Sequence, residues 1–131
     1  MRAIIIPVTP FQQNCSLVWC ADTNQAAVID PGGDLDKILA TIAQEGVTLS
    51  KILLTHAHVD HAGATAELAR RAQVPIIGPH RGDQFWIDAL AEQGRRFGFA
   101  HSESFEPDQW LDDGHRVSLG NGEISVRIFG N

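Results

Sequence analysis

Four side chains that bind metal ions in proteins lie within six residues of one another. His56, His58, Asp60 and His61 follow an apolar run in the stretch LLTHAHVDHAG, residues 53–63. Neutral imidazoles and carboxylates suit zinc, iron or manganese. Four donors on one turn crowd a single ion, so they suit two neighbouring ions, or one ion whose ligands are supported by their neighbours. We therefore predict a metal site here, rather than a polar turn that gathers histidines by coincidence.

The elements around this cluster are those that would place it at the edge of a sheet. The apolar run at 49–55 predicts a buried strand that ends where His56 begins, and ligands of α/β proteins bind at the carboxyl ends of strands. An Ala-rich helix is expected directly after the cluster, over 62–72. Further strands are predicted at 2–6, 15–21, 26–30 and 74–78, a helix from an Asp34 N-cap to Gly46, a helix then loop over 81–98, and a hairpin over 115–129. This order predicts an α/β fold with a mixed sheet.

The composition is that of one ordinary domain spanning residues 1–131. Apolar residues make up 44% of the chain and charged residues 20%, which supplies a core and argues against disorder. A net charge of −6 argues against a nucleic-acid partner. We expect no membrane partner and no signal peptide, because no apolar run is long enough, and we predict a cytoplasmic protein. Cys15 and Cys20 are interpreted as small core residues.

The stretch THAHVDH, residues 55–61, resembles the signature of the metallo-β-lactamase fold superfamily. The segments PFQQNC at 10–15 and VIDPGG at 28–33 are most similar to the glyoxalase II (hydroxyacylglutathione hydrolase) branch. The resemblance implies an αββα sandwich, of which this chain holds mainly the N-terminal half, a mixed sheet with helices on one face. It covers the whole chain and is more specific for the superfamily than for a substrate.

The resemblance also implies roles for individual residues. His56 and His58 match two ligands of a first metal ion, and Asp60 and His61 match two ligands of a second. In such sites a hydroxide held between the ions attacks a carbonyl carbon, and we also assign a catalytic role to Asp60. One or two zinc ions are expected, with iron or manganese as alternatives. Asp30 is predicted either to hydrogen-bond a metal-binding histidine without touching the ion, or to cap the turn that follows it.

The family pattern continues beyond what this chain contains. A histidine in a Gly-His-Thr-like turn, a bridging aspartate and a last histidine are expected downstream, and no such stretch precedes Asn131. We therefore expect the chain to lack the C-terminal half of the domain. His80, His101 and His115 are interpreted as loop residues rather than replacements. A half sandwich leaves an apolar sheet face open, which predicts either a homo-oligomer that covers it or a longer product that was shortened.

Three functions compete at this point. The first is a metal-dependent hydrolase of a small-molecule thioester or ester, such as an acyl-glutathione. The second is a mononuclear iron oxygenase that acts on persulfides, which metal identity would distinguish. The third is a non-catalytic half-domain that binds metal weakly or serves assembly. The resemblance favours the hydrolase for the lineage of this chain, and the missing ligands favour the non-catalytic half-domain for the chain itself.

Overall fold

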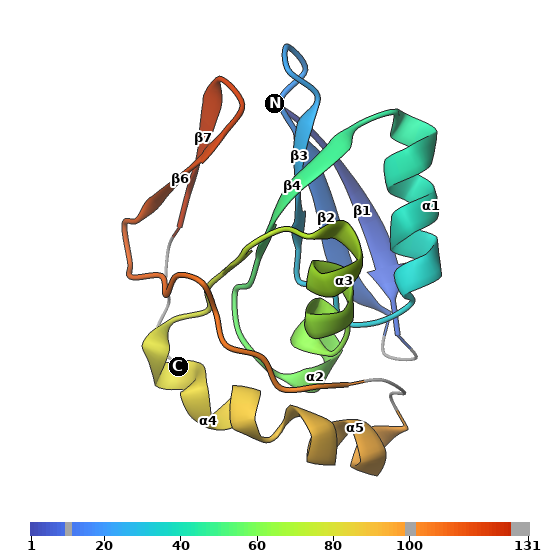
Figure 1. The fold of residues 1–131 in the computed structure, drawn as a ribbon, viewed down its shortest axis with the longest axis vertical. Coiled ribbons are helices and arrows are strands. Elements are labelled where there is room, and N and C mark those ends of the chain that lie inside the picture. The colour runs from blue at the N-terminus through green and yellow to red at the C-terminus, as the bar shows by residue number, and fades with distance from the viewer. Residues whose placement is uncertain (10–11, 99–101, 127–131) are drawn as a thin grey trace.

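A five-stranded mixed sheet forms the centre of the molecule, in the order β1-β2-β3-β4-β5 (Figure 1). The computed structural model describes residues 1–9, 12–98 and 102–126. The first three strands pair antiparallel, and the last two continue the sheet in parallel. The strands are β1 Arg2–Val8, β2 Gln13–Trp19, β3 Gln25–Ile29, β4 Thr48–Leu53 and β5 Ile76–Ile77. The predicted α/β fold with a mixed sheet is confirmed.

Helices cover one face of this sheet and enclose the main core. They are α1 Leu35–Glu45, α2 Val59–Ala62, α3 Thr65–Ala72, α4 Gln84–Asp88 and α5 Leu90–Phe97, with a short 3-10 turn, η1, at Arg81–Asp83. Alternate strand residues such as Leu17 and Val28 are fully buried against Ile38 of α1 and Leu68 of α3. This alternation follows from the two-residue period of a strand with one buried face. The helices thereby fix the strand ends from which the predicted metal-binding residues project.

The other face of the sheet is partly covered by a hairpin near the end of the described chain. Strands β6 Arg116–Leu119 and β7 Gly122–Ser125 pair antiparallel around the predicted glycine-rich turn. Val117 and Leu119 form a second apolar cluster with Leu53 of β4, and Lys51 Nζ donates a hydrogen bond to the Ser118 carbonyl at 2.5 Å. The face is less open than the sequence predicted, although Ile5 on β1 is 55% exposed. Residues 127–129 of the predicted hairpin lie outside the described residues.

Two local predictions need correction. Asp34 occupies the N-cap position of α1, but its side chain does not cap the helix. Its backbone is left-handed, with φ 51°, whereas capping residues are normally extended, and its carboxylate accepts the Thr9 N–H at 2.9 Å instead. The helix predicted over 62–72 is also interrupted. The Ala64 N–H donates to the Pro31 carbonyl at 2.9 Å, which ends α2 and separates it from α3.

The loop expected late in residues 81–98 is instead helical as far as Phe97. Of the helices in the described part of the chain, none combines the length and the apolar character that crossing a bilayer requires.

Candidate metal centre

The candidate centre lies where the parallel strands β3 and β4 end side by side. Asp30 follows β3, and its N–H donates to the Leu53 carbonyl at the end of β4 at 3.0 Å. In return, the Thr55 N–H donates to Asp30 Oδ1 at 2.8 Å. The backbone of Asp30 is left-handed, with φ 58°, a conformation that aspartate tolerates better than most residues. Parallel pairing thus brings the carboxylate of one strand end to the motif at the other.

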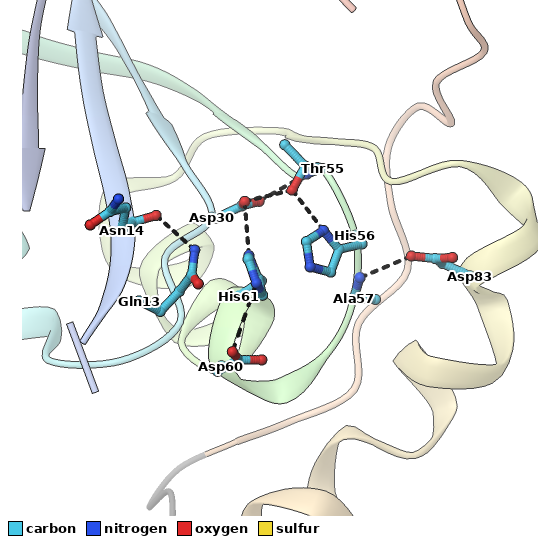
Figure 2. A network of polar contacts seen from close by, with 9 residues as sticks. All are labelled: Gln13, Asn14, Asp30, Thr55, His56, Ala57, Asp60, His61 and Asp83. Atoms are coloured by element: carbon cyan, nitrogen blue, oxygen red, sulfur yellow. Dashed lines mark hydrogen bonds and ion pairs between the residues drawn. The ribbon is translucent and has the colours of Figure 1, made fainter. Parts of the chain in front are cut away.

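The carboxylate of Asp30 is buried and accepts two further hydrogen bonds through Oδ2 (Figure 2). One is donated by Thr55 Oγ1 at 2.6 Å, and the other involves His61 Nδ1 at 3.1 Å. A buried carboxylate without partners would be costly, and these three contacts satisfy it. Asp30 is therefore in contact with a histidine, His61. This contact is required by the first of the two roles predicted for Asp30. Whether that histidine binds a metal stays a prediction.

The same network determines which nitrogen of each histidine carries a proton. A carboxylate only accepts, so His61 Nδ1 carries a proton in this contact, and in a neutral ring Nε2 then keeps a free lone pair. The single hydroxyl proton of Thr55 is donated to Asp30, so Thr55 Oγ1 accepts from His56 Nδ1 at 2.9 Å. His56 therefore also presents an unprotonated Nε2. Neutral imidazoles of fixed tautomer are the form in which histidine binds metals.

The distances between these groups fit a metal centre. One atom from each of Asp30, His56 and His61 can be chosen so that all three lie within 4.8 Å of one another. The rings of His56 and His61 have centroids 3.6 Å apart, and His61 Nε2 lies 3.7 Å from Asp60 Oδ2. Within this group, Asp30 already accepts three hydrogen bonds. His58 lies further out, exposed, with its ring centroid 5.2 Å from that of His56.

Electrostatics also favours the neutral form of the histidine at the centre. Burial lowers the pKa of His56, and the neighbouring His61 adds to this shift by repelling a second positive charge. Asp30 and Asp83 act in the opposite direction without reversing it. An imidazole whose pKa is lowered stays unprotonated further into the acid range, which suits a metal ligand.

Two backbone contacts fix the loop that carries the motif. The Ala57 N–H, between the first two histidines, donates to Asp83 Oδ2 at 3.0 Å (Figure 2). On the other side, Gly32 packs so closely on Asp60 that a Cβ at residue 32 would lie 1.7 Å from the Asp60 carbonyl oxygen. Glycine is required at that position because only a residue without a side chain allows this approach.

The structure also shows which residues the sequence analysis misjudged or missed. One of these is Thr55, whose hydroxyl links Asp30 to His56. Asp83 had no sequence signal beyond its place in a polar turn. A core position would be expected for Phe85 and Trp86 from helical periodicity, but Phe85 is 69% exposed, because short α4 lies at the edge of the core. Trp86 is half-buried, with its ring edge-on to His58 at a centroid distance of 4.5 Å.

The remaining histidines lie away from this centre where they are described. His80 is exposed at the start of η1, and its ring accepts the Gly82 N–H at 3.0 Å. His115 contacts Gln109 in the segment before β6, at 2.8 Å between their side-chain nitrogens. His101 lies outside the described residues.

The fold agrees with the comparisons with known proteins. The chain belongs to the metallo-β-lactamase superfamily, whose family model matches residues 8–127. Among its curated relatives is the hydroxyacylglutathione hydrolase GloC of Haemophilus influenzae, which is 44% identical over 112 residues. That match covers 86% of this chain and 52% of the relative. The glyoxalase II-like resemblance is therefore confirmed, and the chain spans about half the length of the curated relatives it matches.

Solved structures support the same assignment of fold. The BLEG-1 B3 metallo-β-lactamase superposes with a TM-score of 0.79 at 28% identity, covering 95% of this chain and 59% of that one. TTHA1623 in a di-iron-bound form superposes with a TM-score of 0.77 at 32% identity, covering 87% of this chain and 56% of that one. Both matches extend over most of this chain.

Proposed function

We propose that this chain provides the metal-binding part of a hydrolase that acts on small-molecule thioesters or esters, such as acyl-glutathiones. The observation that carries the proposal is the paired orientation of His56 and His61. Their Nδ1 atoms are held through Thr55 and Asp30, so both Nε2 atoms are left as ligands. The 44% identity to a hydroxyacylglutathione hydrolase supports the thioester as substrate class. The whole protein's activity rests on this proposal.

The proposed ligands divide into two pairs. His56 and His58 would hold a first ion, and Asp60 and His61 a second, with zinc as the expected metal and iron or manganese as alternatives. Bound there, the metal would act as a Lewis acid that polarises a carbonyl group and activates water near neutral pH. Asp60 is the one carboxylate among the four motif side chains. It would bind the ion and also balance part of the positive charge of the ion. Asp30 would not touch the ion but would orient His61 from behind.

Elemental analysis of protein purified without chelator is the first test. One or two equivalents of zinc per chain, reduced in His61→Ala and retained in His80→Ala, would support the proposal. His80 is a matched control because it is an exposed histidine outside the motif. Hydrolysis of an acyl-glutathione thioester by the loaded protein would then be measured. No retained metal would favour the non-catalytic half-domain over the enzyme.

Iron is the specific alternative to zinc. The structure of TTHA1623, which is 32% identical to this chain, was solved in a di-iron-bound form. One equivalent of iron without thioester hydrolysis would favour the persulfide oxygenase instead. The same elemental analysis, read together with the hydrolysis assay, therefore separates all three functions.

We further propose that the protein is cytoplasmic, because both cysteines are free thiols.

We also propose that two copies pair through the uncovered part of the sheet. Ile5 on β1 is 55% exposed on the face that the β6–β7 hairpin leaves open. Sedimentation should show a dimer that Ile5→Lys dissociates, while Phe85→Lys, at another exposed apolar side chain, leaves it intact. A monomer at all concentrations would contradict the pairing.

A further inference from the structure

A hollow in the surface opens directly beside the proposed metal ligands. It is lined by His58, Val59, Asp60, Trp86, Gln93 and Phe97. Three of these residues lie in the THAHVDH motif, and three come from α4 and α5. The hollow therefore joins the proposed reacting centre to a wall that the motif itself does not supply.

The wall of the hollow is fixed relative to the motif. Asp83, at the junction of η1 and α4, accepts the Ala57 N–H, and three residues later Trp86 lies edge-on to His58 at 4.5 Å. Behind the wall, Ile87 and Leu90 are fully buried in the main core. Ser104 Oγ also donates to the Ile87 carbonyl at 2.8 Å. These contacts hold α4 and α5 in place, so the aromatic side chains have a defined position beside the centre.

The chemistry of the lining favours an uncharged apolar group. Val59, Trp86 and Phe97 provide apolar surface, and Phe97 keeps 50% of its surface exposed. Gln93 is neutral, and the six described lining residues include neither lysine nor arginine. A carboxylate placed against the wall that α4 and α5 supply would find no lysine or arginine there to pair with it, which is unfavourable. Aromatic rings and an aliphatic side chain instead favour a flat or branched hydrocarbon.

We propose that this hollow binds the acyl part of the substrate and selects aromatic or branched uncharged acyl groups. This inference rests on the proposed thioester hydrolysis. In an acyl-glutathione all formal charges lie on the thiol side, so the charged half is directed away from the hollow. Trp86 and Phe97 are then specificity-determining residues, and the acyl carbonyl lies toward His58 and Asp60.

Binding can be measured apart from catalysis, with two uncharged thioesters of N-acetylcysteamine that differ only in the acyl group. Chelator-treated protein is titrated with the phenylacetyl and the acetyl thioester, and amide and indole N–H shifts are followed by NMR. The phenylacetyl compound should bind about tenfold more tightly, as expected for added hydrocarbon in an apolar pocket. The shifts should centre on Val59, the Trp86 indole and the Gln93 side-chain amide. Equal affinities, or shifts centred elsewhere, would overturn the proposal.

Variants at the rim test the assignment of the wall. Phe97→Ala should reduce the preference for phenylacetyl at least threefold, on the order of the loss of one apolar wall, and Phe97→Leu should retain part of it. Arg96→Ala is the control, because it removes an exposed side chain of the same helix, α5, that does not line the hollow. An unchanged preference in Phe97→Ala, or an equal loss in Arg96→Ala, would refute the subsite.

The metal-loaded protein distinguishes this inference from the function on which it rests. Hydrolysis of both thioesters with the same kcat/KM would support the hydrolase and refute the acyl subsite. Selective binding without any hydrolysis would support the hollow as an apolar binding site and refute the hydrolase. Hydrolysis with a phenylacetyl preference that Phe97→Ala reduces would support both.

Discussion

Replacement of Asp30 by asparagine should change the tautomers of two histidines at once. The amide oxygen introduced by Asp30→Asn can still accept the Thr55 N–H, which places the NH2 group where Asp30 Oδ2 now accepts two hydrogen bonds. That NH2 group would donate to Thr55 Oγ1 and to His61 Nδ1. Thr55 would then donate its own proton to His56 Nδ1. Both histidines would carry their proton on Nε2, the nitrogen that is proposed to bind metal.

The expected loss of metal affinity follows from the hydrogen bonds in which donor and acceptor are exchanged. Loss of a carboxylate that orients a metal-binding histidine typically weakens metal binding about 10- to 100-fold, or about 1.4 to 2.7 kcal/mol. Because two histidines depend on Asp30, we expect Asp30→Asn to lie near the hundredfold end. The metal-free protein should lose about 1 to 2 kcal/mol of unfolding free energy, since three charge-assisted hydrogen bonds become neutral ones.

Imidazole 15N chemical shifts of the metal-free protein are the decisive measurement, because they distinguish the protonated from the unprotonated ring nitrogen. In the parent protein both His56 and His61 should be protonated at Nδ1, and in Asp30→Asn both should be protonated at Nε2. Thr55→Val removes the hydroxyl that joins Asp30 to His56. His56 should then lose its fixed tautomer, while His61 keeps its proton on Nδ1. If His56 keeps its Nδ1 proton in Asp30→Asn, the relay through Thr55 is wrong.

Three other predictions follow from single contacts. Asp83→Ala should weaken zinc binding about tenfold by releasing the Ala57 N–H, whereas Asp83→Asn keeps an acceptor oxygen and should restore it, as chelator competition would show. Gly32→Ala should cost about 1 to 3 kcal/mol in urea unfolding, because its Cβ would overlap the Asp60 carbonyl, and an unchanged midpoint would contradict that close approach. The Asn121 N–H, with contacts from Thr23 and Asp22, lowers the pKa of Cys20 from 9.0 to about 7. Between these values the unfolded chain binds more protons, so stability should rise from pH 7 to 9 in the parent protein and less in Cys20→Ser.

The elements around the site could be predicted because each has a local cause. The buried strand predicted at 49–55 is present as β4, Thr48–Leu53, and Gly46 ends α1 with the positive φ that favours glycine. The burial of Cys15 and Cys20 also follows from the residue type. In each case the residues that decide the outcome are neighbours in the chain.

The features that sequence reasoning missed depend on partners far away in the chain. The break between α2 and α3 requires the Pro31 carbonyl, 33 positions before Ala64 by their residue numbers. The role of Asp83 requires an N–H that is 26 positions away. The exposure of Phe85 depends on where α4 sits against the sheet, which helical periodicity does not specify. A residue's type indicates what it can bind, but only the tertiary fold supplies the partner.

Because β3 and β4 pair in parallel, we expect the centre to form late in folding. Asp30 reaches Thr55 and His61 across 25 and 31 positions, so its contacts form only after α1 has closed the crossover between the strands. Closure of such loops costs entropy before the contacts compensate for it. In the unfolded chain the motif histidines lack the carboxylate that orders them, so an ion should prefer the folded state. Each tenfold rise of free metal above its Kd then adds about 1.4 kcal/mol to stability, and metal supply becomes a control on how much folded protein accumulates.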